Sequence, residues 1–172
     1  MTKYQTSEGE YMKRLFTVLL LFLTVLMCSC QKEYGILDYQ KGSITAECVI
    51  NGKYTVEIAK RAEDCTVTVL KPQHAKGITF TVGEEVLMST GDLSLQVERK
   101  SVQGICALAE IFSQREECLT TANQKGEKSV LTFQNDGCVY QITMGKNSLP
   151  QLVHIVSEDF EYEVKINSIE LK

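Results

Sequence analysis

Cysteine is the residue type best suited to chemistry in this chain of 172 residues, which holds seven cysteines and only two histidines. Cys28 and Cys30 lie close together near the N-terminus. The other five are Cys48, Cys65, Cys106, Cys118 and Cys138. None of these five shows a Cys-x-x-Cys spacing and the histidines are remote, so the pattern of a zinc site is missing. Their odd number leaves at least one thiol free or paired with another chain.

The neighbours of these cysteines favour burial. Cys48, Cys65 and Cys138 each alternate with apolar residues, as in a strand with one buried face. A buried free cysteine behaves as a small hydrophobic residue, so we expect these three thiols in the core. Disulfides among the five stay open as an alternative, because they are common in exported proteins.

Other candidates for chemistry are weak. His154 lies among apolar residues of a predicted strand, and His74 lies in a polar loop without a nucleophile beside it. Acidic pairs such as Glu158-Asp159 fall at turns and lack the ligand spacing of a calcium loop. We therefore expect no enzyme, no cofactor and no metal site. A net charge of -4 and a pI of about 5.3 argue against a nucleic-acid binder with a basic face.

The N-terminal segment has the order of a secretory signal. Basic Lys13-Arg14 precede a run from Leu15 to Met27 that is apolar apart from two threonines. This run is shorter than the ~20 residues that a membrane-spanning helix needs, which favours a cleaved signal peptide. A retained transmembrane anchor is the alternative. We assign residues 1–29 to the signal peptide. Residues 1–11 contain two glutamates, which suit a signal poorly, so Met12 is an alternative start.

Leu26-Met27-Cys28-Ser29-Cys30 resembles the lipobox of bacterial lipoproteins, in which a small residue precedes the cysteine that becomes lipidated. Ser29 precedes Cys30, whereas the bulkier Met27 precedes Cys28, so we expect lipid on Cys30. The resemblance implies palmitate-type acyl chains and a domain held on the exported side of the cell membrane. Two or three acyl chains anchor stably where one does not. The alternative is an ordinary signal peptide that ends beside a cysteine.

The rest of the chain predicts one α+β domain, residues 42–172, joined to the anchor by a tether at 30–41. Period-two patterns between turn residues predict ten strands, at 43–50, 53–60, 65–71, 77–82, 86–90, 93–98, 128–135, 138–144, 151–156 and 160–171. An apolar stripe predicts a helix at 102–114, capped by Ser101, with 115–123 extending it or forming a second helix. The helix must pack on the apolar face of a curved antiparallel sheet.

Hairpin parity refines two turns. A two-residue loop at Asp136-Gly137 pairs Phe133 with Tyr140, which matches apolar neighbours in a type I′ hairpin. Between the first two strands a two-residue loop would set apolar against polar residues, so the loop must be odd in length. We predict Ile50-Asn51-Gly52, with Cys48 opposite Tyr54. Cys48 and Cys65 then lie on strands that flank a common neighbour, too far apart for a disulfide.

Three stretches resemble the LolA/LppX-like lipoprotein-carrier superfamily: Gly77 to Val82, Gly91 to Leu95 before the helix, and Ser148 to Val153 before the last hairpin. The resemblance covers residues 41–172 and implies a half barrel whose helix covers a cavity for acyl chains. The chain departs from the larger carriers in having one clear helix. The candidate lining comes from inward positions: Phe80, Val82, Leu95, Phe112, Phe133, Tyr140 and Ile142.

This resemblance implies a membrane-anchored lipoprotein that binds an amphiphile, a lipid or a lipoprotein in an apolar groove. The alternative is a lipoprotein without enzymatic activity that acts as the partner or regulator of a cell-envelope enzyme, as some germination lipoproteins do. The expected partners are thus a membrane, a hydrophobic ligand or an envelope protein, and no nucleic acid. An open apolar cavity would favour the first function, and a filled core with an exposed apolar patch would favour the second.

Overall fold

The computed structural model describes residues 37–62, 64–125 and 128–172, which belong to one compact unit, Ile36–Lys172. The predicted signal peptide, both N-terminal cysteines and most of the tether lie outside the described residues. A 3-10 turn, η1 (Asp38–Lys41), precedes the first strand, and Leu37 and Tyr39 are buried in the core. Packing therefore begins before residue 42, where the sequence placed the start of the domain.

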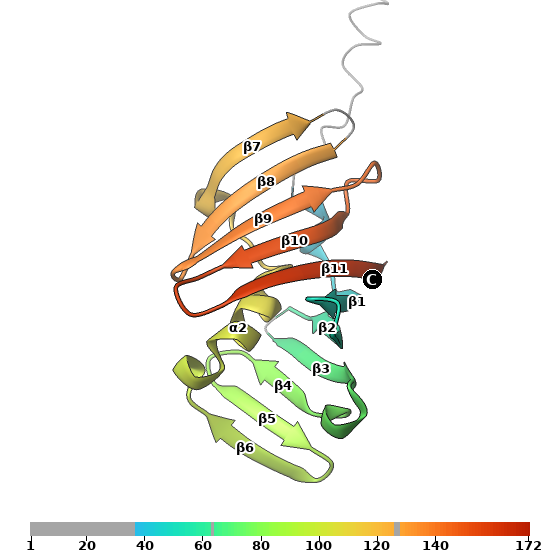
Figure 1. Ribbon diagram of the computed structural model, residues 1–172, viewed down its shortest axis with the longest axis vertical. Helices are drawn as coiled ribbons and strands as arrows, with labels where there is room; N and C mark the ends of the chain where they lie inside the picture. The colour runs from blue at the N-terminus through green and yellow to red at the C-terminus, as the bar shows by residue number, and fades with distance from the viewer. Residues whose placement is uncertain (1–36, 63, 126–127) are drawn as a thin grey trace, which may run out of the picture. The chain divides into compact units, whose positions relative to one another are not determined.

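One antiparallel sheet of eleven strands forms the body of this unit. The strands are β1 (Ile44–Ile50), β2 (Tyr54–Lys60), β3 (Cys65–Lys71), β4 (Thr79–Val82), β5 (Val86–Thr90), β6 (Leu93–Val97), β7 (Leu119–Lys125), β8 (Lys128–Asn135), β9 (Cys138–Met144), β10 (Pro150–Val156) and β11 (Glu161–Leu171). Their order is β6-β5-β4-β3-β2-β1-β11-β10-β9-β8-β7, so β6 and β7 are the two edges (Figure 1). The sheet is curved and stays open, as predicted.

The first and the last strand meet in the middle of the sheet. Ile44 of β1 pairs with Leu171 of β11, and Ile50 pairs with Val164. Strands β1 to β6 follow one another on one side of this pairing, and β11 back to β7 follow on the other. Each half is therefore a simple meander, and the β1–β11 pairing joins the two.

Alternation along the strands produces one buried face, which we call the inner face. In β1, Ile44, Ala46, Cys48 and Ile50 are buried and the residues between them are only half-buried. The same alternation buries Cys138, Tyr140, Ile142 and Met144 of β9. Side chains of successive strand residues point to opposite faces, so each strand contributes every second residue to a shared core.

The Asp136-Gly137 hairpin forms as predicted. Phe133 pairs with Tyr140 and Leu131 with Ile142. Asp136 and Gly137 have φ values of 47° and 77°, the positive values that a type I′ turn requires.

The turn between β1 and β2 is odd in length, as predicted, but the predicted register is wrong. The loop is Asn51-Gly52-Lys53, and Cys48 pairs with Val56, not with Tyr54. Positive φ values at Asn51 and Gly52 let the chain reverse one residue later than expected, so Ile50 still pairs in the ladder. A shift of two residues keeps the same side chains on the inner face, which is why parity alone could not detect it.

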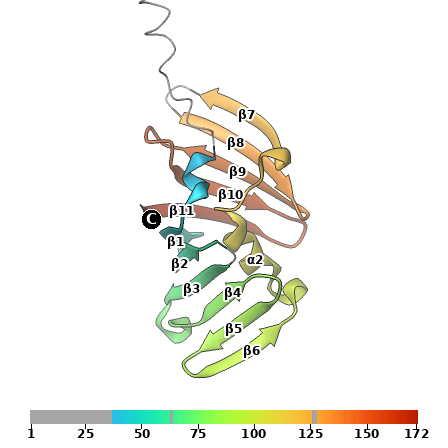
Figure 2. The ribbon, with the colours of Figure 1, turned by 180° about the vertical axis from the view of Figure 1, so that it is seen from behind.

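Helix α2 (Gln103–Glu110) crosses the concave inner face and contacts β2, β3 and β4 (Figure 2). It is shorter than predicted and follows a 3-10 turn, η3 (Arg99–Val102). Ser101 lies within η3, and no side-chain hydrogen bond caps the helix. The Ser101 N–H bonds to the Glu98 carbonyl, three residues back, so the first turn is a 3-10 turn and the α-helix begins only after it.

The segment after the helix differs from the expectation of further helix. Residues after Glu110 form a turn and a short 3-10 helix, η4 (Glu116–Cys118), and then strand β7. β7 pairs with β8 from Leu119 to Lys125. The β-branched pair Thr120-Thr121 favours extended backbone, and the open edge of β8 provides the partner. This strand was missing from the prediction.

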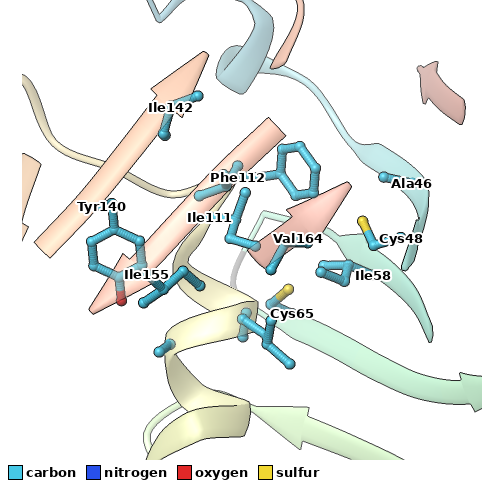
Figure 3. Close-up of a cluster of buried hydrophobic side chains, with 14 of the residues drawn as sticks. Ala46, Cys48, Ile58, Cys65, Ile111, Phe112, Tyr140, Ile142, Ile155 and Val164 are labelled. Atoms are coloured by element: carbon cyan, nitrogen blue, oxygen red, sulfur yellow. The ribbon is translucent and has the colours of Figure 1, made fainter. Parts of the chain in front are cut away.

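The core lies between the inner face of the sheet and the segment formed by α2 and the residues after it. Ile111 and Phe112, which follow the helix, are fully buried together with Phe133 and Tyr140. Figure 3 shows Ile111 and Phe112 among inward side chains from β1, β2, β9, β10 and β11. Cys48, Cys65 and Cys138 are buried in the same core, as predicted. All five described cysteines are free thiols, and Cys48 and Cys65 lie on the two neighbours of β2.

Candidate functional site

A hollow of about 480 Å³ opens between helix α2 and the β8–β9 hairpin, and we call it the α2 cleft. It is lined by Arg99, Lys100, Gln103, Cys106, Ala107, Glu110, Asp136, Cys138 and Tyr140. The helix thus packs closely on β2 to β4 on one side and leaves space on the other. The interior of the half barrel is incompletely filled at this place.

Local structure explains why these residues meet. Residues three and four apart lie on one side of a helix, which brings Gln103, Cys106 and Glu110 to the cleft. Turn η3 adds the two basic side chains of Arg99 and Lys100 at the start of the helix. On the opposite wall, the alternation of β9 directs Cys138 and Tyr140 inward.

The walls of the α2 cleft are mostly apolar. Ala107 and the thiols of Cys106 and Cys138 are buried, and the ring of Tyr140 is fully buried. Burial raises the pKa of both thiols, so they stay protonated at neutral pH. Because the thiolate is the nucleophilic form of cysteine, these walls present small apolar groups and no activated nucleophile.

Glu110 is the polar centre of the α2 cleft. The Tyr140 hydroxyl donates a hydrogen bond to its Oε2 over 3.0 Å, and Asn135 Nδ2 donates to the same oxygen over 3.4 Å. Arg99 Nη1 lies 3.9 Å from its Oε1. Desolvation nevertheless raises the pKa of Glu110 above its ordinary value, because burial penalises the charged form more than these partners favour it.

A second, smaller hollow of about 250 Å³ lies on the other side of the Arg99–Glu110 pair. It reaches Lys60, Asp64 and Cys65 and shares Arg99 and Glu110 with the α2 cleft. Arg99 is held there by a hydrogen bond from its Nη2 to the Gly83 carbonyl, over 2.7 Å. The ion pair therefore lies between two hollows that flank the helix.

The predicted lining residues fall into three groups. Phe112, Phe133 and Ile142 are fully buried in the filled core. Tyr140 lines the α2 cleft and Val82 lines the smaller hollow. Phe80 is half-buried and Leu95 is exposed. A ligand-binding role for these residues stays a prediction.

Phe80 and Leu95 belong to an apolar part of the inner face that α2 leaves uncovered. Val67, Phe80, Met88 and Leu95 are successive cross-strand partners from β3 to β6. Burial decreases along this row, from 0% exposure at Val67 to 60% at Leu95, and the neighbouring Leu93 is 72% exposed. We call Phe80, Met88, Leu93 and Leu95 the β4–β6 ledge.

The cleft residues Arg99, Lys100, Gln103, Glu110 and Asp136 were not among the predicted site residues. A signal for some of them existed, because Gln103, Cys106 and Glu110 follow helical spacing beside the apolar stripe. The contribution of η3 had no such signal. Within the described part of the chain, no three His, Cys, Asp or Glu side chains are grouped to hold a metal ion. None of the helices described there is long and apolar enough to span a bilayer.

No protein-family model and no curated protein matches this sequence. An uncharacterized conserved protein from Thermus thermophilus is similar in structure, with 14% identity and a TM-score of 0.48, over 80% of this chain and 85% of that one. A LolA superfamily protein from Nitrosomonas europaea has 9% identity and a TM-score of 0.36, over 80% of this chain and 92% of that one.

Proposed function

We propose that the chain is an exported lipoprotein, anchored to a membrane through Cys30, whose domain binds an amphiphile in the α2 cleft. The observation that carries this proposal is the cleft itself. Its volume of about 480 Å³ falls within the range of about 300–1,000 Å³ that is typical of small-molecule sites.

The apolar walls suit the hydrophobic part of such a ligand. Ala107, Tyr140 and the two protonated thiols line the hollow with apolar atoms, and each is at most 4% exposed, so an acyl chain or ring would contact them by entering the space beside the helix. Removal of apolar surface from water contributes ~25 cal/mol per Å². Binding then needs no deformation of the core, because the space already exists beside the helix.

The rim suits an anionic head group. Lys100 and Arg99 lie together at the start of the helix, and Lys100 is exposed. Glu110 is hydrogen-bonded by Tyr140 and lies 3.9 Å from Arg99, whose guanidinium balances its charge, so the exposed Lys100 is the cation that remains for an anion. A carboxylate, sulfate or phosphate head near Lys100 would leave the apolar tail over Ala107 and Tyr140. The proposed role of this space is binding without catalysis.

The charge-reversed variant Lys100→Glu tests the rim in the full chain. We expect the dissociation constant for a fluorescent fatty acid to rise about three- to tenfold, which is about 0.7–1.4 kcal/mol. Lys53→Glu is the matched control, because Lys53 is exposed in the β1–β2 loop and does not line the cleft. Fluorescence titration gives both constants, and circular dichroism checks the fold.

A cleft-filling variant, Gln103→Trp, tests the location of the tail. We expect it to lose saturable binding of the same probe while the protein stays folded. The absence of saturable binding by the unmodified chain would overturn the proposal, as would equal binding by the Lys100 and Lys53 variants.

A second function is favoured by the β4–β6 ledge. Two largely exposed leucines on the inner face form an apolar patch beside an otherwise filled core. Such patches often mark protein contacts. An interaction module at the membrane, without a ligand, is therefore the alternative if the cleft proves unable to bind amphiphiles.

A further inference from the structure

Strand β6 is an edge of the sheet that lacks the usual protection against pairing with another strand. Its sequence, Leu93-Ser94-Leu95-Gln96-Val97, has neither charge nor proline. Its pairing with β5 runs without a register shift. Natural edge strands are normally blunted by charges, prolines or bulges. The opposite edge, β7, has such an irregularity, between Leu119 and Thr121.

The hydrogen-bonding groups of β6 also point outward. The two-residue turn at Gly91-Asp92 makes Thr90 and Leu93 the closing pair of the hairpin. Pairs in an antiparallel ladder alternate between bonded and non-bonded, so Leu93, Leu95 and Val97 bond to β5. The backbone N–H and C=O groups of Ser94 and Gln96 therefore face away from β5, toward the open edge.

We propose that β6 pairs antiparallel with β6 of a second copy of this chain, with Gln96 opposite Gln96. The pairing joins two β4–β6 ledges into one apolar surface, because Leu95 of each copy then lies beside Val97 of the other. It is independent of the ligand proposed for the α2 cleft.

Charge decides between the two registers that pair most of the strand. A register centred on Leu95 places Asp92 opposite Glu98 twice, and like charges directly opposite each other are destabilising. A register centred on Gln96 places Glu98 opposite the uncharged Ser94. The Gln96 register is the one that the charges favour.

Five residues a side form a small interface, below the ~1,000 Å² of a stable complex in dilute solution. The dimer is therefore weak in solution and is favoured wherever copies are held close together, because effective concentration replaces affinity. Anchorage to one membrane would provide that condition.

Cysteine crosslinking of the full chain tests the register. Gln96→Cys should form a disulfide-linked dimer under mild oxidation, because bonded antiparallel pairs have Cα atoms about 5.5 Å apart, within disulfide range. Leu87→Cys is the matched control: Leu87 is exposed on the neighbouring strand and pairs with Gln96, but it is not at the edge. All other cysteines are the same in both variants, so the difference in dimer yield on a non-reducing gel reports the edge.

Proline tests the backbone pairing. Gln96→Pro removes an outward N–H and leaves the bonds to β5 in place, which an edge strand tolerates. Sedimentation equilibrium of the full chain in detergent should show a dissociation constant at least tenfold higher than for Gln96→Ala. Equal constants for these two variants, or crosslinking of Gln96→Cys no faster than of Leu87→Cys, would overturn the proposal. Faster crosslinking of Leu95→Cys than of Gln96→Cys would overturn the register.

Discussion

Glu110 is the residue on which the most interactions of the α2 cleft converge. Its carboxylate accepts hydrogen bonds from Tyr140 and Asn135 and faces Arg99. Burial raises its pKa despite these partners. A carboxyl that is desolvated and hydrogen-bonded at the same time responds to both pH and the loss of a single partner.

The first prediction concerns stability against pH. A raised pKa in the folded state means that Glu110 stabilises the fold fully below the ordinary pKa of a glutamate, about 4.3, where it is protonated in both states. This contribution is lost as pH rises through the folded-state pKa. Glu110→Gln removes the titration, so we expect the unfolding free energy of the unmodified chain to fall relative to the variant across that window. Urea denaturation between pH 4 and 7 measures both, and parallel profiles would contradict the assignment.

The second prediction concerns the Tyr140 hydroxyl. Its hydrogen bond lowers the pKa of Glu110 against the larger effect of burial. Tyr140→Phe keeps the ring in the core and removes this bond, so the pKa of Glu110 should rise further. NMR titration of the Glu110 carboxyl checks the direction, with Tyr39→Phe as a control because Tyr39 bonds Gln40 instead. An unchanged or lower value would show that the bond does not act on the carboxylate.

Sequence reasoning identified the inward residues better than it identified the site. Period-two alternation is enough to place Phe133, Tyr140 and Ile142 inside. It does not distinguish a position in a filled core from one beside a hollow, because both are inward. The rim residue Lys100 reaches the cleft through η3, a turn that no periodic pattern predicts. Leu95 was placed on the correct face, but how far the helix extends over that face depends on tertiary packing.

At the scale of elements, hairpins with a strong local signal were predictable, as was the edge strand β6, but the other edge strand, β7, was not. Asp136-Gly137 fixes its turn type by positive φ values, and its register follows. The β1–β2 loop has positive φ at Asn51 and Gly52, which both residue types tolerate, but parity did not decide which three residues form the loop. β7 has few apolar residues, because an edge strand needs only one partner, so its pattern was too weak to separate it from helix.

The third prediction concerns how α2 is held against the sheet. Gly104 faces the Tyr162 ring of β11, and a Cβ at this position would overlap the Tyr162 hydroxyl. Alanine favours helix over glycine by about 1 kcal/mol, yet we expect Gly104→Ala to lower the melting temperature. Tyr162→Phe in the same chain removes the overlapping oxygen and should recover part of the loss. A rise in melting temperature for Gly104→Ala alone would show that helix propensity outweighs this contact.

At the scale of the whole molecule, the proposed function depends on attachment to a membrane. The fourth prediction is that Cys30→Ala releases the protein from membranes and abolishes labelling by a fatty-acid probe. The reason is that stable anchoring needs the acyl chains that this cysteine would carry. Cys28→Ala is the matched control and should stay labelled and membrane-bound. Label that persists in Cys30→Ala and vanishes in Cys28→Ala would assign the lipid to the other cysteine.

The pairing of β1 with β11 has a consequence for biosynthesis. While the chain leaves the ribosome, β1 to β6 can form one meander and β7 to β10 another. Each meander then has an unpaired strand edge, at β1 and at β10, with which β11 later pairs. Only the arrival of β11 closes both edges, through contacts as distant in sequence as Ile44 with Leu171. Pairing across such separations slows folding. For the exported chain that we propose, this delay would keep the sheet incomplete during passage through a secretion channel. The β1–β11 pairing would then form after the chain has crossed the membrane.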